Sequence, residues 1–185
     1  PNKNELSESK ALLKSQRDLP QALKEVLQKI PATAHPMDVM RTGTSMLGNL
    51  EPEGDFSNQL NSINRMIATM ASIVTNWYKY SHDGEDISLV NDEDSMAGHF
   101  LHILHGKTPS DLHRKVMDVS LVLYAEHEFN ASTFTGRVCA STMSDIHSCV
   151  VAAIGSLRGP LHGGANEKAM ELIENWTSRE EAKEN

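Results

Sequence analysis

The sequence is poor in several features that would define a class of protein. Its 185 residues include two cysteines, 5% aromatic residues and no block of basic residues, and 25 acidic residues against 17 Lys and Arg give a net charge of -8. This charge balance argues against a nucleic-acid or anionic-membrane surface. No apolar run approaches the roughly 20 residues of a membrane-spanning helix, and residues 1–10 lack the apolar core of a signal peptide. We therefore expect a soluble cytoplasmic protein with no membrane or nucleic-acid partner.

The two cysteines, Cys139 and Cys149, are ten positions apart in sequence with a helical pattern. On one continuous helix they would lie about 15 Å apart, which is too far for a disulfide. We therefore expect two reduced thiols, as is usual in a reducing compartment.

Apolar residues recur at spacings of three and four along most of the chain, which is the pattern of amphipathic helices. The clearest stripe runs from Leu60 to Trp77 and predicts one helix of about 20 residues that ends near Gly84. Another helix is expected after Thr108, with Thr108 as its cap and Pro109 in its first position. No sustained alternation bounded by hairpin turns is present. The sequence predicts an all-α fold of seven or so helices in one domain.

Three histidines at positions 99, 102 and 105 suggest a metal site at first sight. A step of three residues turns a helix by 300°, so the outer two histidines point about 120° apart and cannot easily share an ion. We therefore assign no metal ligands, although a metal-binding helical bundle stays open as an alternative.

A second candidate is His127, which lies between Glu126 and Glu128 at the end of an apolar helix. A nearby carboxylate would favour the charged imidazole, and a cationic donor suits a dianionic substrate. The alternative is a surface histidine at the end of a helix, stabilised by the helix dipole.

The third candidate is His162, within the sequence Arg-Gly-Pro-Leu-His-Gly-Gly-Ala-Asn-Glu at residues 158–167. Three glycines and a proline predict a tight loop, and the helix that follows points its free N–H groups back toward that loop. A neutral histidine there can donate a hydrogen bond to a carbonyl oxygen as an enolate develops. The alternative is an exposed histidine in a glycine-rich helix connection.

The chain resembles the citrate synthase family at these residues. The stretch 159–167 resembles the family's histidine loop, and residues 126–132 resemble its oxaloacetate-binding segment. Residues 35–43, His-Pro-Met-Asp-Val-Met-Arg-Thr-Gly, are similar to a third family stretch. Finer features at residues 77–82, 98–102 and 127–135 resemble the 2-methylcitrate synthase branch.

The resemblance implies a multi-helical, homodimeric acyltransferase that condenses an acyl-CoA thioester with oxaloacetate. For this branch the thioester is propionyl-CoA and the product is 2-methylcitrate, a reaction of propionate catabolism; acetyl-CoA, the substrate of citrate synthase in the tricarboxylic acid cycle, is the alternative. By the same resemblance, His162 hydrogen-bonds the thioester carbonyl and His127 binds oxaloacetate, with Asn130 and Ser132 supporting the two imidazoles. Coenzyme A enters as part of the substrate, and no cofactor is implied.

The family's second catalytic histidine and its catalytic aspartate are expected C-terminal to residue 185. We therefore expect residues 1–185 to be a partial large domain, with the small domain mostly absent and with negligible activity in isolation; Pro1 in place of Met agrees with this. A further alternative is a non-catalytic dimerisation module that packs through the helices at residues 110–123 and 146–157.

Overall fold

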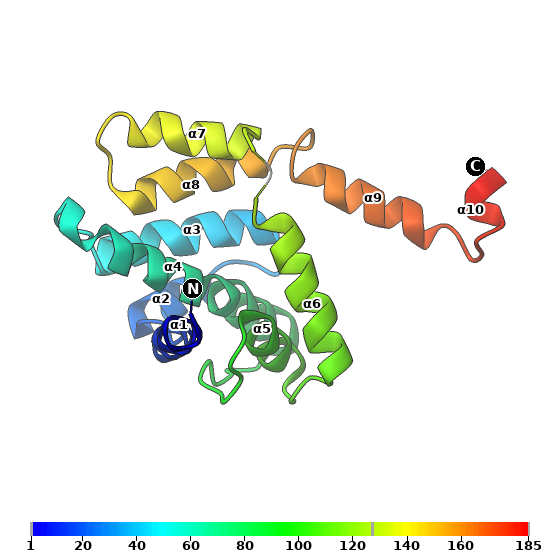
Figure 1. Cartoon of the computed structure of the whole chain (residues 1–185), viewed down its shortest axis with the longest axis horizontal. Coiled ribbons are helices and arrows are strands. Elements are labelled where there is room, and N and C mark those ends of the chain that lie inside the picture. The colour runs from blue at the N-terminus through cyan, green and yellow to red at the C-terminus, as the bar shows by residue number, and fades with distance from the viewer. Residues whose placement is uncertain (1, 127, 185) are drawn as a thin grey trace.

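The computed structural model describes residues 2–126 and 128–184, with the side chain of residue 184 left out. In that part of the chain the secondary structure is helical throughout and contains no strand, so the predicted all-α fold is confirmed (Figure 1). The elements are α1 (Lys3–Ser15), α2 (Gln21–Leu27), α3 (Pro36–Leu50), the 3₁₀ turn η1 (Phe56–Asn58), α4 (Gln59–Tyr78), the π-helical turn η2 (Lys79–Asp83), α5 (Met96–His105), α6 (Asp111–Tyr124), α7 (Ala131–Ala140), α8 (Ile146–Leu157), α9 (Gly164–Glu174) and α10 (Glu181–Glu184).

Ten α-helices are described where seven or so were expected, and α1 accounts for part of the difference. Its sequence has too few apolar residues to show a clear stripe, and none of its side chains is buried. The helix is started by a capping box, in which the Asn2 side chain accepts from the Glu5 backbone and the Glu5 carboxylate accepts from the Asn2 backbone. Local capping therefore makes a helix that hydrophobic periodicity did not predict.

The core is built around α4, the helix that the sequence predicted most clearly. Trp77 is buried at its C-terminal end and donates its indole N–H to the Ile30 carbonyl at 3.2 Å. As expected, the helical segment then ends at Gly84, which has a left-handed backbone and follows the single turn η2. The buried apolar side chains that pack together are Leu19, Leu23, Leu27, Val39, Leu47, Met66, Ile73, Trp77, Leu89 and Ile103.

His99, the first member of the histidine stripe, is fully buried and bonded through both ring nitrogens. Its Nδ1 lies 3.0 Å from the Asn91 amide nitrogen and its Nε2 lies 3.2 Å from the Ser72 hydroxyl. Because Ser72 donates its own proton to the Arg17 carbonyl, His99 must donate through Nε2 and accept through Nδ1. Burial, with the positive charge of Arg17, lowers the pKa of His99 to about 4. His99 is thus a neutral structural residue.

The two cysteines lie on different helices, so the assumption of one continuous helix was wrong. A short turn after α7 reverses the chain, and α8 runs back alongside it (Figure 1). The contact is close, since a Cβ at Gly136 would lie 3.5 Å from the Ala153 methyl group. Burial and a hydrogen bond with the Cys139 thiol raise the pKa of the Cys149 thiol to about 11. Both cysteines are free, as expected.

One helix start also differs from the sequence prediction. The cap of α6 is Ser110, whose hydroxyl accepts from the His113 backbone at 3.2 Å, and not Thr108. Thr108 and Pro109 precede the helix because Ser110 and Asp111 supply a better cap and an acidic first turn. Among the described residues, no helix is both long and apolar enough to cross a bilayer.

Candidate active site

Three of the four predicted site residues, with His35, lie where the N-terminal ends of three helices meet. His162 is in the loop between α8 and α9, Asn130 and Ser132 begin α7, and His35 begins α3. Side-chain contacts join these segments, although they are far apart in the sequence. Helix N-termini carry unpaired N–H groups and a partial positive charge, so their meeting point favours a bound anion.

The loop that carries His162 is a tight turn built on its glycines. The Gly159 carbonyl accepts from the backbone N–H groups of both His162, at 3.0 Å, and Gly164, at 3.3 Å. The Gly163 backbone N–H donates to the Leu157 carbonyl at 2.9 Å. A Cβ at Gly163 would lie 2.2 Å from that carbonyl oxygen, so a side chain has no room there. The expected tight loop is therefore present, and its shape depends on glycine.

His162, Ser132 and Asn130 form a chain of hydrogen bonds. The Nε2 atom of His162 lies 2.9 Å from the Ser132 hydroxyl oxygen, which lies 2.7 Å from the Asn130 carboxamide oxygen. That carboxamide oxygen also caps α7, because it accepts from the Thr133 backbone N–H at 2.9 Å. The cap fixes the orientation of Asn130, and Asn130 then fixes Ser132. The structure therefore brings together three of the four predicted site residues.

This chain of bonds defines the proton positions that His162 can adopt. When the Ser132 hydroxyl donates to Asn130, its oxygen accepts from His162 Nε2–H and leaves Nδ1 as a free acceptor. If that hydroxyl rotates and donates to His162, Nε2 becomes an acceptor. In this arrangement Nε2 also accepts from the Ser132 backbone N–H, at 3.4 Å. The proton of neutral His162 then resides on Nδ1, where it is available to a bound carbonyl. Ser132 can serve either tautomer.

The fourth predicted residue, His127, lies outside the described residues. Its neighbour Glu128 has a left-handed backbone, with φ at 51°, and donates its N–H to the Glu126 carboxylate. Next to it, the Arg137 guanidinium lies 5.4 Å from the centre of the Phe129 ring. This is a cation–π contact between the last turn of α7 and the segment that precedes the helix.

Sequence reasoning did not assign a role to His35 or Asp38, although the residues belong to a stretch that carries the family resemblance. In the structure, His35 Nε2 lies 3.2 Å from the Glu167 carboxylate, and Asp38 lies 3.3 Å from Arg158 Nε. Glu167 and Arg158 flank the His162 loop on its two sides. The family resemblance of residues 35–43 therefore pointed to this segment, but its contacts with Glu167 and Arg158 could not be predicted from the sequence.

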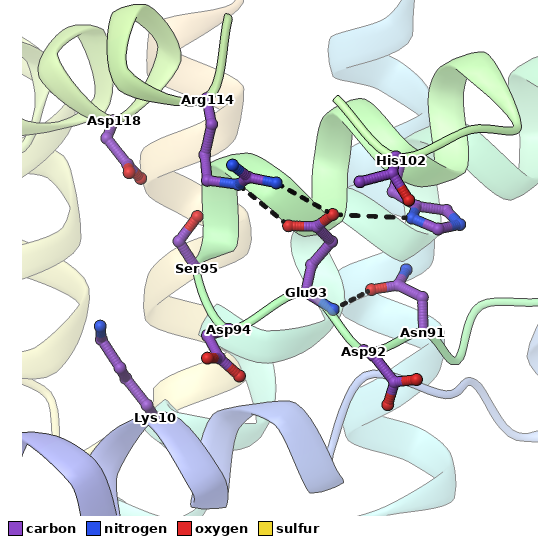
Figure 2. A pocket seen from close by; sticks show the side chains of 10 residues that line it. Lys10, Asn91, Asp92, Glu93, Asp94, Ser95, His102, Arg114 and Asp118 are labelled. Atoms are coloured by element: carbon purple, nitrogen blue, oxygen red, sulfur yellow. Dashed lines mark hydrogen bonds and ion pairs between the residues drawn. The ribbon is translucent and has the colours of Figure 1, made fainter. Parts of the chain in front are cut away.

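A separate cavity of about 710 Å³ lies between α1, α6 and the segment that precedes α5 (Figure 2). In it, the Glu93 carboxylate forms two contacts with Arg114, at 3.0 and 3.3 Å, and lies 3.9 Å from His102 Nδ1 (Figure 2). The Glu93 carboxylate is thus paired with the Arg114 guanidinium in the wall of this cavity. Among the described residues, no group of three or more His, Cys, Asp and Glu side chains could hold a metal ion.

Comparison with known proteins agrees with this geometry. A family model described as citrate synthase, C-terminal domain, matches residues 1–185. The chain is 64% identical over 184 residues to 2-methylcitrate synthase of Shewanella oneidensis, which covers 100% of this chain and 49% of that protein. It is 41% identical over 177 residues to citrate synthase of Heyndrickxia coagulans, with 94% and 47% covered. The chain thus spans about half the length of the curated relatives it matches.

Two solved structures have the same arrangement of helices. Citrate synthase from Thermotoga maritima MSB8 matches with a TM-score of 0.80 and 31% identity, covering 100% of this chain and 48% of that one. Citrate synthase from Thermoplasma acidophilum, solved with carboxymethyl coenzyme A and oxaloacetate, matches with a TM-score of 0.86 and 27% identity, covering 96% and 47%.

Fold and site together define a multi-helical domain of the citrate synthase type, with its histidine loop at a junction of helix N-termini. The chain belongs to the citrate synthase family.

Proposed function

We propose that this chain forms the large-domain part of a 2-methylcitrate synthase, an acyltransferase that condenses propionyl-CoA with oxaloacetate and water to give 2-methylcitrate and CoA. The observation that carries the proposal is the glycine loop in which Ser132 and Asn130 hold His162. The 64% identical relative bears the name of this enzyme, which favours propionyl-CoA over acetyl-CoA.

The chemistry of such a condensation suits a neutral histidine. A base removes a proton from the α-carbon of the thioester, and negative charge develops on the carbonyl oxygen. The His162 proton on Nδ1 can hydrogen-bond that oxygen and so stabilise the enol. The enol carbon then attacks the ketone carbon of oxaloacetate, and hydrolysis of the thioester releases CoA. The meeting of three helix N-termini favours the dianion oxaloacetate, and His127 is proposed to bind it.

We also propose that the remaining groups of the mechanism lie outside residues 1–185. The base that takes the α-proton and the second catalytic histidine have no counterpart in this part of the family pattern. General acids and bases typically contribute about 10²- to 10⁴-fold each and act as a unit, so these residues alone are expected to give negligible turnover.

The active enzyme is proposed to be a homodimer that forms through the helices of this domain. The α7 side chains Phe134 and Val138 are 62% and 51% exposed, and the outer face of the α7–α8 pair is left uncovered by the described residues. Exposed apolar side chains on a helical face suit self-association about a two-fold axis.

A chimera tests the proposed reaction directly. Residues 1–185 would replace the matching 184 residues of the 64% identical relative, and CoA release from propionyl-CoA and from acetyl-CoA would be compared in the presence of oxaloacetate. We expect turnover with both thioesters and a higher kcat/KM for propionyl-CoA, because one methylene contributes about 1 to 3 kcal/mol of discrimination. A folded chimera that is inactive with both would contradict the proposal, and a preference for acetyl-CoA would indicate a citrate synthase.

A further inference from the structure

The first turn of α3 contacts the polypeptide on both sides of the His162 loop. Arg158, the residue that ends α8, donates from Nε to the Asp38 carboxylate at 3.3 Å. On the other side, the Glu167 carboxylate in the first turn of α9 lies 3.2 Å from His35 Nε2. The loop is thus attached at two points to two residues that are three positions apart on one helix.

His35 is suited to this contact in its neutral form. Its Nδ1 atom accepts the Met37 backbone N–H at 3.1 Å and caps α3, so the ring proton must be on Nε2. That proton points toward Glu167. One imidazole therefore both starts α3 and holds the first turn of α9.

The attachment is important because α9 has little else to hold it. No side chain of α9 is buried, and the helix extends away from the body of the molecule (Figure 1). The Asp38 contact is similarly exposed, with 35% and 39% of the two side chains open to solvent. Such pairs add little to overall stability. We expect the two contacts to fix the position of the His162 loop instead.

We propose that His35 and Asp38 are positioning residues for His162. The inference rests on the proposed function, since it concerns the orientation of the catalytic imidazole. A displacement of about 1 Å in a reacting group can lower a rate by about 10²-fold, so weak contacts that set a loop position can have a large kinetic effect.

The test uses His35→Asn in the active chimera. Asparagine is a good helix cap, so α3 still starts, but its side chain is too short to reach Glu167. We expect kcat to fall about 10- to 100-fold. KM for oxaloacetate should change by less than about twofold, and the melting temperature should fall by no more than about 4 °C. Asp38→Asn should have the same pattern, and Asp38→Glu, which keeps the carboxylate, should restore part of the rate.

Glu167→Ala, which removes the oxygen that accepts the His35 proton, should lower kcat as much as His35→Asn does, and the double variant should be no slower than either single one. The control is Glu171→Ala, which removes another exposed carboxylate of α9, bonded to Lys168 on the same helix. Its kcat should equal that of the parent. If His35→Asn keeps its kcat in an active chimera, or if the two effects simply add, the positioning role is refuted while the proposed reaction stands. An inactive parent chimera refutes both.

Discussion

The position of His162 depends on residues without a functional group as much as on its hydrogen-bond partners. Gly163 lies against the backbone of Leu157, and Asn130 is held by its cap on α7. The sequence allowed the loop and both polar partners to be predicted, because each lies within a recognisable motif. The contacts of His35 and Asp38 could not be predicted, because they join segments 132 and 120 positions apart.

Gly163→Ala is predicted to destabilise the loop. The added Cβ would lie 2.2 Å from the Leu157 carbonyl oxygen, a backbone atom that cannot move aside freely. We expect a loss of about 1 to 3 kcal/mol in unfolding free energy, measured by urea denaturation. The control is Gly155→Ala within α8, where the new methyl group meets no atom within 4 Å. That variant should be as stable as the parent or about 0.5 to 1 kcal/mol more stable; equal stability losses in both would argue against the clash.

Burial of neutral His99 predicts that the protein loses stability in mild acid. In the folded state its pKa is about 4, whereas the ordinary pKa of a histidine is 6.5. Between these values the unfolded chain binds a proton that the folded chain does not, so stability is full above about pH 6.5 and falls toward about pH 4. The contribution is about 3 kcal/mol. Urea denaturation of the parent and of His99→Gln should show a flatter pH dependence in the variant; identical slopes would contradict the prediction.

At the scale of elements, the helices with clear apolar stripes were predicted well and those defined by tertiary contacts were not. The 20-residue α4 and its stop at Gly84 follow from the sequence. The helix expected at residues 146–157 has the bounds of α8, whereas the single helix considered for Cys139 and Cys149 is divided by a turn that lacks glycine and proline. Helix α1 was missed because its cap, and not its apolar pattern, defines it.

The start of α8 depends on a carboxylate from a distant loop. Glu53 is 6% exposed and accepts the Ile146 backbone N–H at 2.7 Å, next to the cap formed by Asp145. Glu53→Gln keeps an acceptor oxygen but removes the charge that favours a helix N-terminus. We expect a loss of about 0.5 to 2 kcal/mol in unfolding free energy. Glu8→Gln, on the exposed face of α1, is the control and should change stability by less than about 0.5 kcal/mol. Equal effects would remove the special role of Glu53.

At the scale of the whole molecule, the described residues leave the outer face of α7 uncovered. If this face forms the proposed dimer, Phe134→Glu combined with Val138→Glu should convert dimers into monomers in sedimentation experiments, because buried charges at an interface are costly. Leu6→Glu on α1 alters a side chain of comparable exposure, 47%, and should leave the dimer intact. A dimer that persists in the double variant would place the interface elsewhere.

The most direct test of the central claim is the kcat of His162→Ala in the chimera, measured with propionyl-CoA and oxaloacetate. His113→Ala, which alters an exposed histidine of α6, serves as the control. If His162 stabilises the enol, its loss should lower kcat by about 10²- to 10⁴-fold, while the control retains normal turnover. A His162→Ala enzyme with near-normal kcat would contradict the account.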